Sequence, residues 1–151
     1  MIAWRLPGGG ERCGEPGTRG PYAPPMTTVA EVMTPCPFVI MEELSLTDAL
    51  ARMSQHGIRH LPVFAGSHLV GIVSERDVAV VSSIDGVDPN KTMITEAMTE
   101  HPYTVGPRDG LKSVVTTMVE KKFGAAIVMD QGDLKGIFTT VDGMRKLAEL
   151  L

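Results

Sequence analysis

The chain has few cysteines, no long apolar run and no surplus of positive charge. Only Cys13 and Cys36 are cysteines among its 151 residues, and these two residues do not form the spaced pairs of a disulfide framework or a zinc motif. No apolar segment approaches the ~20 residues that a membrane-spanning helix requires. The formal net charge of −4 argues against general nucleic-acid binding. Together these absences favour a reducing, cytoplasmic setting without nucleic-acid or membrane partners.

Sequence motifs of the common catalytic and metal sites are also missing. The chain has no G-x-S-x-G, no H-E-x-x-H and no phosphate loop ending in G-K-[ST]. Its four histidines do not form a helix-spaced pair, since Gly57 interrupts the run between His56 and His60. We therefore expect no catalytic residues, no metal ligands, no required cofactor and no enzymatic activity.

The first 26 residues differ in composition from the rest of the chain. Residues 1–25 hold six of the sixteen glycines and five of the eleven prolines. Such a segment cannot bury enough apolar surface to offset the entropy lost on ordering. The composition predicts a disordered tail over residues 1–26.

The remaining chain is an internal repeat. From Thr27 to Asp142 it aligns with itself at a shift of 65 residues without a gap, and twelve positions carry the same residue in both copies. One copy contains GIVSERD at residues 71–77 and the other GIFTTVD at residues 136–142. We place the first repeat at residues 27–84, a polar linker at 85–91 and the second repeat at 92–151.

Each repeat predicts the element order β-α-β-β-α. Apolar residues at helical spacing form one stripe in each copy, and Ser45 and Asp109 are candidate N-caps for the two helices. Two short β-branched runs follow in each copy, separated by turn residues, which is typical of a hairpin. A three-stranded sheet this small cannot bury both faces alone, so we expect an α/β fold in which the two repeats pack sheet against sheet. The stripes are Leu46, Ala49, Leu50 and Met53, and Leu111, Val114, Val115 and Met118.

The S-x-x-D pattern from Ser74 to Asp77 has two interpretations. Taken alone, it is a capping box in which the hydroxyl and carboxylate stabilise the first turn of a helix. The same geometry also suits a phosphate at the helix N-terminus and a ribose diol at the carboxylate. The pattern recurs at Thr139 to Asp142 after a matching glycine, which favours the second interpretation without excluding the first.

Taken together, MTPCPFV, GIRHLPVF and LVGIVSERD, repeated as MTEHPYTV, FGAAIVM and LKGIFTTVD, resemble a tandem pair of CBS domains. The resemblance covers residues 27–151. It implies a pseudo-twofold module with two clefts between the repeats. In this family the clefts commonly bind AMP, ADP, ATP, S-adenosylmethionine or NAD, and the module regulates another protein.

The resemblance also assigns ligand-binding roles to particular residues. Aspartates are implied to bind ribose, hydroxyl residues near them to contact phosphate, and first-strand residues to line the base pocket. The basic residues before the LPV segment and before the first aspartate are implied to face phosphate, and Pro62 is a further ligand-binding residue. These residues are Thr34, Phe38, Val39, Arg59, His60, Pro62, Ser74, Arg76, Asp77, Thr99, Tyr103, Thr104, Thr139 and Asp142.

The two repeats differ in their basic residues. Arg59, His60 and Arg76 have no basic counterpart in the second repeat, where Gly124, Ala125 and Val141 occupy these positions. We expect unequal clefts, with phosphate-facing charge concentrated in the first repeat. For Arg59 and Arg76, an ordinary surface ion pair with Glu75 or Asp77 is the alternative.

Two functional hypotheses follow. The first is a regulatory module that binds an adenine nucleotide and signals to an unknown protein partner. The second is a structural dimerisation domain without a ligand, in which the S/T-x-x-D patterns are only helix caps. Self-association into a homodimer is expected in either case from apolar residues beyond those that the repeat needs, among them Val78, Val80, Val81, Met144 and Leu147.

Overall fold

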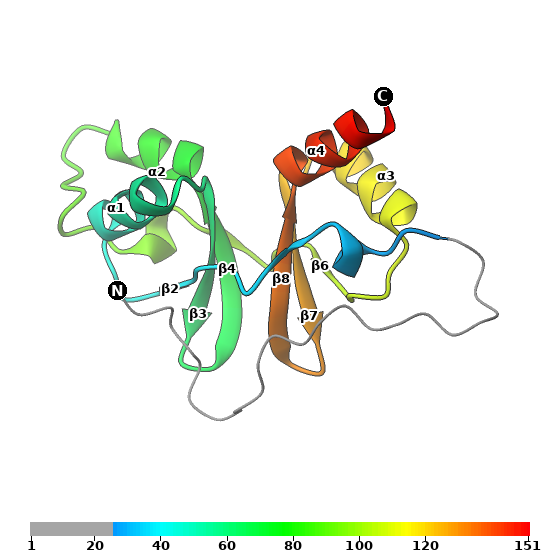
Figure 1. Cartoon of the computed structure of the whole chain (residues 1–151). Coiled ribbons are helices and arrows are strands. Elements are labelled where there is room, and N and C mark those ends of the chain that lie inside the picture. The colour runs from blue at the N-terminus through cyan, green and yellow to red at the C-terminus, as the bar shows by residue number, and fades with distance from the viewer. Residues whose placement is uncertain (1–25) are drawn as a thin grey trace. The chain divides into compact units, whose positions relative to one another are not determined.

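The computed structural model describes residues 26–151, so the predicted tail lies outside the described residues except for Met26. The described chain has the mixed α and β fold that the sequence predicted, and it contains two four-stranded sheets (Figure 1). In chain order the elements are η1 (Val29–Glu31), β1 (Thr34–Pro35), β2 (Ile40–Met41), α1 (Leu46–His56), β3 (His60–Ala65), β4 (His68–Ser74), α2 (Glu75–Ser82), η2 (Ile94–Glu96), β5 (Thr99–Glu100), β6 (Thr104–Val105), α3 (Leu111–Lys121), β7 (Ala125–Asp130), β8 (Asp133–Thr139) and α4 (Thr140–Leu150).

The described chain divides into two compact units that do not coincide with the sequence repeats. Unit 1 contains Phe38–Pro102, and unit 2 contains residues 26–37 together with Tyr103–Leu151. The sheet of unit 1 has the order β2-β3-β4-β5, and that of unit 2 has the order β1-β8-β7-β6. Each sheet therefore gains a fourth strand from the beginning of the other repeat, which the three-stranded prediction missed. A cut in the linker would separate each sheet from one of its strands.

The helices of unit 1 form where the apolar periodicity placed them. Ser45 caps α1, since its hydroxyl accepts from the Asp48 amide at 3.2 Å and its own amide donates to the Asp48 carboxylate at 2.9 Å. The helix ends at Gly57, which adopts the left-handed conformation at φ 63°. Helices α1 and α2 lie side by side in this unit (Figure 1).

Three expectations about helix caps and helix surfaces were wrong. Asp109 does not cap α3, because Gly110 is the N-cap and the Asp109 carboxylate instead accepts from the Gly106 amide at 2.9 Å. Val115, expected in the apolar stripe, is exposed. Val78, expected to be available for self-association, is fully buried in the core of unit 1.

The glycine that opens each repeated signature lies where a strand of the other repeat crosses it. A Cβ on Gly71 would stand 2.8 Å from the Thr99 carbonyl oxygen and 2.7 Å from the Met98 sulfur. Gly136 has the same surroundings, 2.8 Å from the Thr34 carbonyl oxygen and 2.5 Å from the Met33 sulfur. The repeated glycine therefore has a packing role, namely to let β5 or β1 pair closely with the hairpin.

Each unit has its own apolar core, formed by one helix pair against one sheet. In Figure 1, α3 and α4 lie beside β7 and β8 in unit 2, as α1 and α2 do beside the hairpin of unit 1. Among the described residues, no helix is both long enough and apolar enough to span a membrane. The buried residues that form the main apolar cluster are Ile40, Leu46, Ala49, Met53, Leu61, Val63, Val73, Val78 and Ile94 in unit 1, and Val29, Val105, Val114, Met118, Ala126, Val128 and Phe138 in unit 2.

Candidate functional site

The first S-x-x-D pattern lies at the junction between β4 and α2 in unit 1. Strand β4 ends at Ser74, which has extended backbone and is the N-cap of α2. The Ser74 amide donates to Asp77 Oδ2 at 2.9 Å, and the Asp77 amide donates to Ser74 Oγ at 3.1 Å. The capping interpretation of the sequence is therefore correct for this pair. These two hydrogen bonds do not use all the hydrogen-bonding capacity of the two side chains.

Several polar groups at this junction have no partner among the described residues. Asp77 Oδ1 receives no hydrogen bond there, and the Ser74 hydroxyl accepts a bond without donating one. The Glu75 amide donates to the Arg59 carbonyl at 2.9 Å, whereas the Arg76 amide, in the first turn of α2, has no intrahelical acceptor. The junction thus offers a carboxylate oxygen to a diol, and a hydroxyl and an amide to an anion.

The basic residues predicted for phosphate gather near the same junction. Arg59 directly precedes β3, His60 is its first residue, and Arg76 is exposed on the first turn of α2. Arg59 pairs with Glu75 at 4.0 Å, and the two side chains are 79% and 58% exposed. An ion pair this long and exposed stabilises little, so the guanidinium is available to an anionic ligand.

His60 is half-buried beside Asp77 and favours its neutral form. Burial lowers the pKa of His60 because desolvation disfavours the imidazolium; the Asp77 carboxylate opposes this effect, and the nearby Arg59 charge adds to it. A bound phosphate would favour the imidazolium and make ligand binding take up a proton.

The pKa of His60 predicts how stability depends on pH. Because the folded-state pKa lies below the unfolded value of 6.5, the unfolded state binds more protons as the pH falls through this value. The contribution of His60 is fully present above about pH 6.5 and is lost below it, with a slope of at most about 1.4 kcal/mol per pH unit. Urea unfolding at several pH values between about 5 and 8 measures this slope, which His60→Gln should reduce. His68→Gln, at the exposed start of β4, is the control and should follow the parent; an unchanged slope in His60→Gln contradicts the prediction.

The apolar residues predicted to bind the ligand in unit 1 have different surroundings. Phe38 stacks on His56, with ring centroids 3.6 Å apart and planes within 10°. Val39 is buried, and its carbonyl accepts from Arg52 Nη1 at 2.6 Å, so one acceptor position of that carbonyl is already used. Pro62 is buried within β3.

Thr99 belongs to unit 1 although it lies in the second repeat. It lies in β5, opposite Ile72 of β4. Thr34 has the equivalent position in unit 2, opposite Ile137 of β8. Each threonine is therefore held in the same unit as the aspartate of the other repeat, which sequence order alone does not indicate.

In unit 2 the equivalent aspartate is buried and fully bonded. Asp142 is 4% exposed. Its Oδ1 accepts from Thr34 Oγ1 at 3.2 Å and from Arg145 Nη1 at 3.0 Å. Its Oδ2 accepts from the Thr139 amide at 2.9 Å and from the Thr139 hydroxyl at 3.2 Å. Sequence analysis missed Arg145, although its spacing of three residues from Asp142 on a helix is a signal for such a pair.

The remaining predicted residues of unit 2 lie on and before β6. Tyr103 stacks against Phe123, with ring centroids 5.3 Å apart. Thr104 is the exposed first residue of β6, opposite Ile127 of β7. No basic residue takes the places of Arg59, His60 and Arg76 here, as the sequence indicated.

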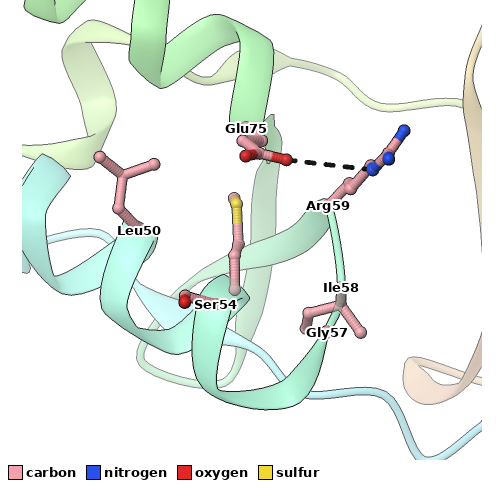
Figure 2. Close-up of a pocket in the computed structure, with 7 residues that line it drawn as sticks. Leu50, Ser54, Gly57, Ile58, Arg59 and Glu75 are labelled. Carbon is pink, nitrogen blue, oxygen red and sulfur yellow. Dashed lines mark ion pairs between the residues drawn. The ribbon is translucent and has the colours of Figure 1, made fainter.

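A pocket of ≈ 420 Å³ lies between α1 and the start of α2 in unit 1 (Figure 2). Leu50 and Ser54 of α1 line one side, and Glu75 at the start of α2 points toward Arg59 on the other. Arg59 is the one predicted ligand-binding residue in its lining, and neither Ser74 nor Asp77 borders it. The pocket therefore borders the β4–α2 junction at Glu75 and Arg59 but does not include the S-x-x-D pair. Among the described residues, no three of His, Cys, Asp or Glu gather in a way that would hold a metal ion.

Comparison with known proteins places this geometry in a family. The sequence profile of the CBS domain matches residues 29–83 and 94–149. A curated relative, the inosine-5′-monophosphate dehydrogenase of Korarchaeum cryptofilum, is 33% identical over 68% of this chain, and the match spans only 21% of the dehydrogenase.

Two solved structures are similar to the chain over most of its length. The structure of CBSX2 in complex with AMP is 30% identical, with a TM-score of 0.70, over 81% of this chain and 97% of CBSX2. The CBS domain pair of MJ0100, in complex with 5′-methylthioadenosine and S-adenosyl-L-methionine, is 25% identical, with a TM-score of 0.73, over 84% of this chain and all of that pair.

Proposed function

Because the chain belongs to the CBS domain family, we propose that it is a regulatory module that binds an adenine nucleotide, or another adenosine-containing ligand, through unit 1. The AMP complex of CBSX2 and the S-adenosylmethionine complex of the MJ0100 pair support a ligand-binding role of this kind. In this proposal Asp77 accepts hydrogen bonds from the ribose diol. Ser74 and the Arg76 amide donate to phosphate, with Arg59, His60 and the Arg76 side chain supplying positive charge.

One observation carries the choice of unit 1. At the β4–α2 junction, Asp77 Oδ1 has no bonding partner among the described residues, whereas both oxygens of Asp142 are bonded. A diol can therefore reach Asp77 without breaking an existing bond. The three nearby basic residues complement a phosphate on the same ligand.

The proposed role is regulation of a partner, not catalysis. CBS domains also occur in enzymes such as the dehydrogenase relative, and there the matching part is a fraction of the protein. Ligand binding can signal only if the ligand has different affinities for two states of the module. The proposed output is therefore a change in the rigidity or self-association of the module that a protein partner detects.

Thermal unfolding in the presence of adenine ligands tests the proposal. AMP, ADP, ATP, S-adenosylmethionine and adenosine are added separately to the whole chain, with GMP as the control for base recognition. A ligand at about a hundredfold above its Kd stabilises the folded state by about 2.7 kcal/mol, which raises Tm. If none of the five adenosine compounds raises Tm more than GMP does, the proposal is wrong.

A second candidate, a structural homodimerisation domain, is favoured by exposed apolar side chains on the helices of unit 2. Val119 of α3 is 72% exposed, and Met144 and Leu147 of α4 are 65% and 47% exposed. Apolar residues at this exposure are typical of an interface between copies. A dimer in light scattering, combined with no ligand-dependent change in Tm, would favour this candidate over the first.

A further inference from the structure

The two S/T-x-x-D junctions differ in the number of hydrogen bonds that the chain donates to the aspartate carboxylate. In unit 1, one backbone amide among the described residues donates to the Asp77 carboxylate. In unit 2 a guanidinium, two hydroxyls and one amide bond to Asp142, and three segments of the chain contribute them. The sequence difference behind this contrast is at position 145, because the equivalent residue in the first repeat is Val80.

We propose that Arg145 is a specificity-determining residue that keeps Asp142 from binding a ribose diol, so that the module takes its adenosine ligand at Asp77 alone. This inference rests on the proposed function and names the residue that makes the two junctions unequal. It concerns the ribose contact, whereas the absence of basic residues in the second repeat concerns the phosphate.

The physical argument is a competition for one carboxylate. Arg145 Nη1 lies 3.0 Å from Asp142 Oδ1, and the carboxylate is 4% exposed, so water screens the pair weakly on that side. A ribose diol donates two neutral hydrogen bonds and brings no positive charge. To bind, it would have to displace a charge-assisted bond and leave a buried carboxylate without its counter-charge, which is unfavourable.

The Arg145 side chain is 65% exposed, so replacing it leaves no cavity in the core. Arg145→Val introduces the residue of the first repeat at this position. The control is Lys146→Val, which also introduces the residue of the first repeat, Val81, and removes an ion pair of the same spacing, that between Lys146 and Glu149 at 3.0 Å. The control does not touch Asp142. Arg145→Ala serves as a second variant if Arg145→Val lowers solubility.

Calorimetric titration with adenosine and with AMP tests the inference. The parent and Lys146→Val should bind one adenosine per chain, and Arg145→Val should bind two. In an Asp77→Asn background, adding Arg145→Val should tighten adenosine binding at least about tenfold. This is the affinity expected from a hydrogen bond to a charged group, which Arg145 blocks in the parent. The added site should disappear in Asp142→Asn.

Each outcome separates this inference from the proposed function. A parent that binds at one site and an Arg145→Val protein that gains none overturn the inference alone, as does a parent that already fills two sites. Weaker binding in Arg145→Val also overturns it, since Arg145 would then contact the ligand. If the parent binds nothing and Arg145→Val binds adenosine, the inference holds and the proposed site at Asp77 is wrong; if neither binds, both are wrong.

Discussion

Asp77→Asn is expected to weaken AMP binding by about ten- to a hundredfold without unfolding the module. The asparagine side chain keeps an oxygen that accepts from the Ser74 amide, so the cap of α2 is retained. It presents an NH₂ group and no charge where Asp77 Oδ1 offers an acceptor. A hydrogen bond to a charged group contributes about 1.5–3 kcal/mol, which corresponds to the expected loss. Calorimetric titration of both proteins with AMP measures it.

A modified ligand distinguishes a direct ribose contact from an indirect effect of Asp77→Asn. The parent should bind 2′,3′-dideoxy-AMP more weakly than AMP, because the deoxy sugar cannot donate to Asp77. Asp77→Asn should bind the two ligands about equally, since the contact has already been removed. If Asp77→Asn retains parental affinity, or if it still prefers AMP to the same degree as the parent, Asp77 does not bind the ribose.

Gly71→Ala and Gly136→Ala are each expected to lower the free energy of unfolding by about 2–3 kcal/mol. A Cβ at either position would stand 2.8 Å from a backbone carbonyl oxygen of the crossing strand, and a backbone atom cannot turn away as a side chain can. Forcing an extra carbon into such a site costs about 1–3 kcal/mol, and displacing a paired strand places these cases at the upper end. Urea unfolding followed by circular dichroism gives the free energies.

Gly106→Ala provides the matched control for the two glycine variants. Its nearest neighbour would be the Asp109 carboxylate at 3.5 Å, an ordinary van der Waals contact, so a change within about 0.5 kcal/mol is expected. If Gly71→Ala and Gly136→Ala are as stable as Gly106→Ala, the crossing strands do not pack as closely as described.

Much of the local structure could be predicted because its causes lie close together in the sequence. Ser45 is the N-cap of α1 as predicted and forms a capping box with Asp48 three residues later, and Gly57, which interrupts the run between His56 and His60, ends the helix. The error at Asp109 shows the limit of such arguments. The Asp109 carboxylate, one residue before the Gly110 N-cap, accepts from the Gly106 amide and not from an amide of α3. A short-range pattern did not distinguish these two arrangements.

The candidate site was predicted in its residue types and only partly in its grouping. Ser74 and Asp77 lie together because one strand–helix junction carries both. Thr34 and Asp142 are bonded across 108 residues of sequence, and this pairing follows from the exchange of β1 and β5 between the repeats. The sequence of residues 27–37 does not indicate which sheet they join, because a two-residue strand is too short for its pattern of apolar and polar residues to favour one sheet over the other.

By itself the sequence determined the repeat, the helix and hairpin within it and the aspartate at each strand–helix junction, because periodicity, capping and turn chemistry act over a few residues. Only the tertiary structure decided which threonine meets which aspartate, why the repeated glycine tolerates no side chain, and that Asp142 is held by Arg145 while Asp77 Oδ1 accepts no hydrogen bond from the described residues. These properties depend on which distant segments pair and on which charges are buried together, and neither is fixed by local sequence.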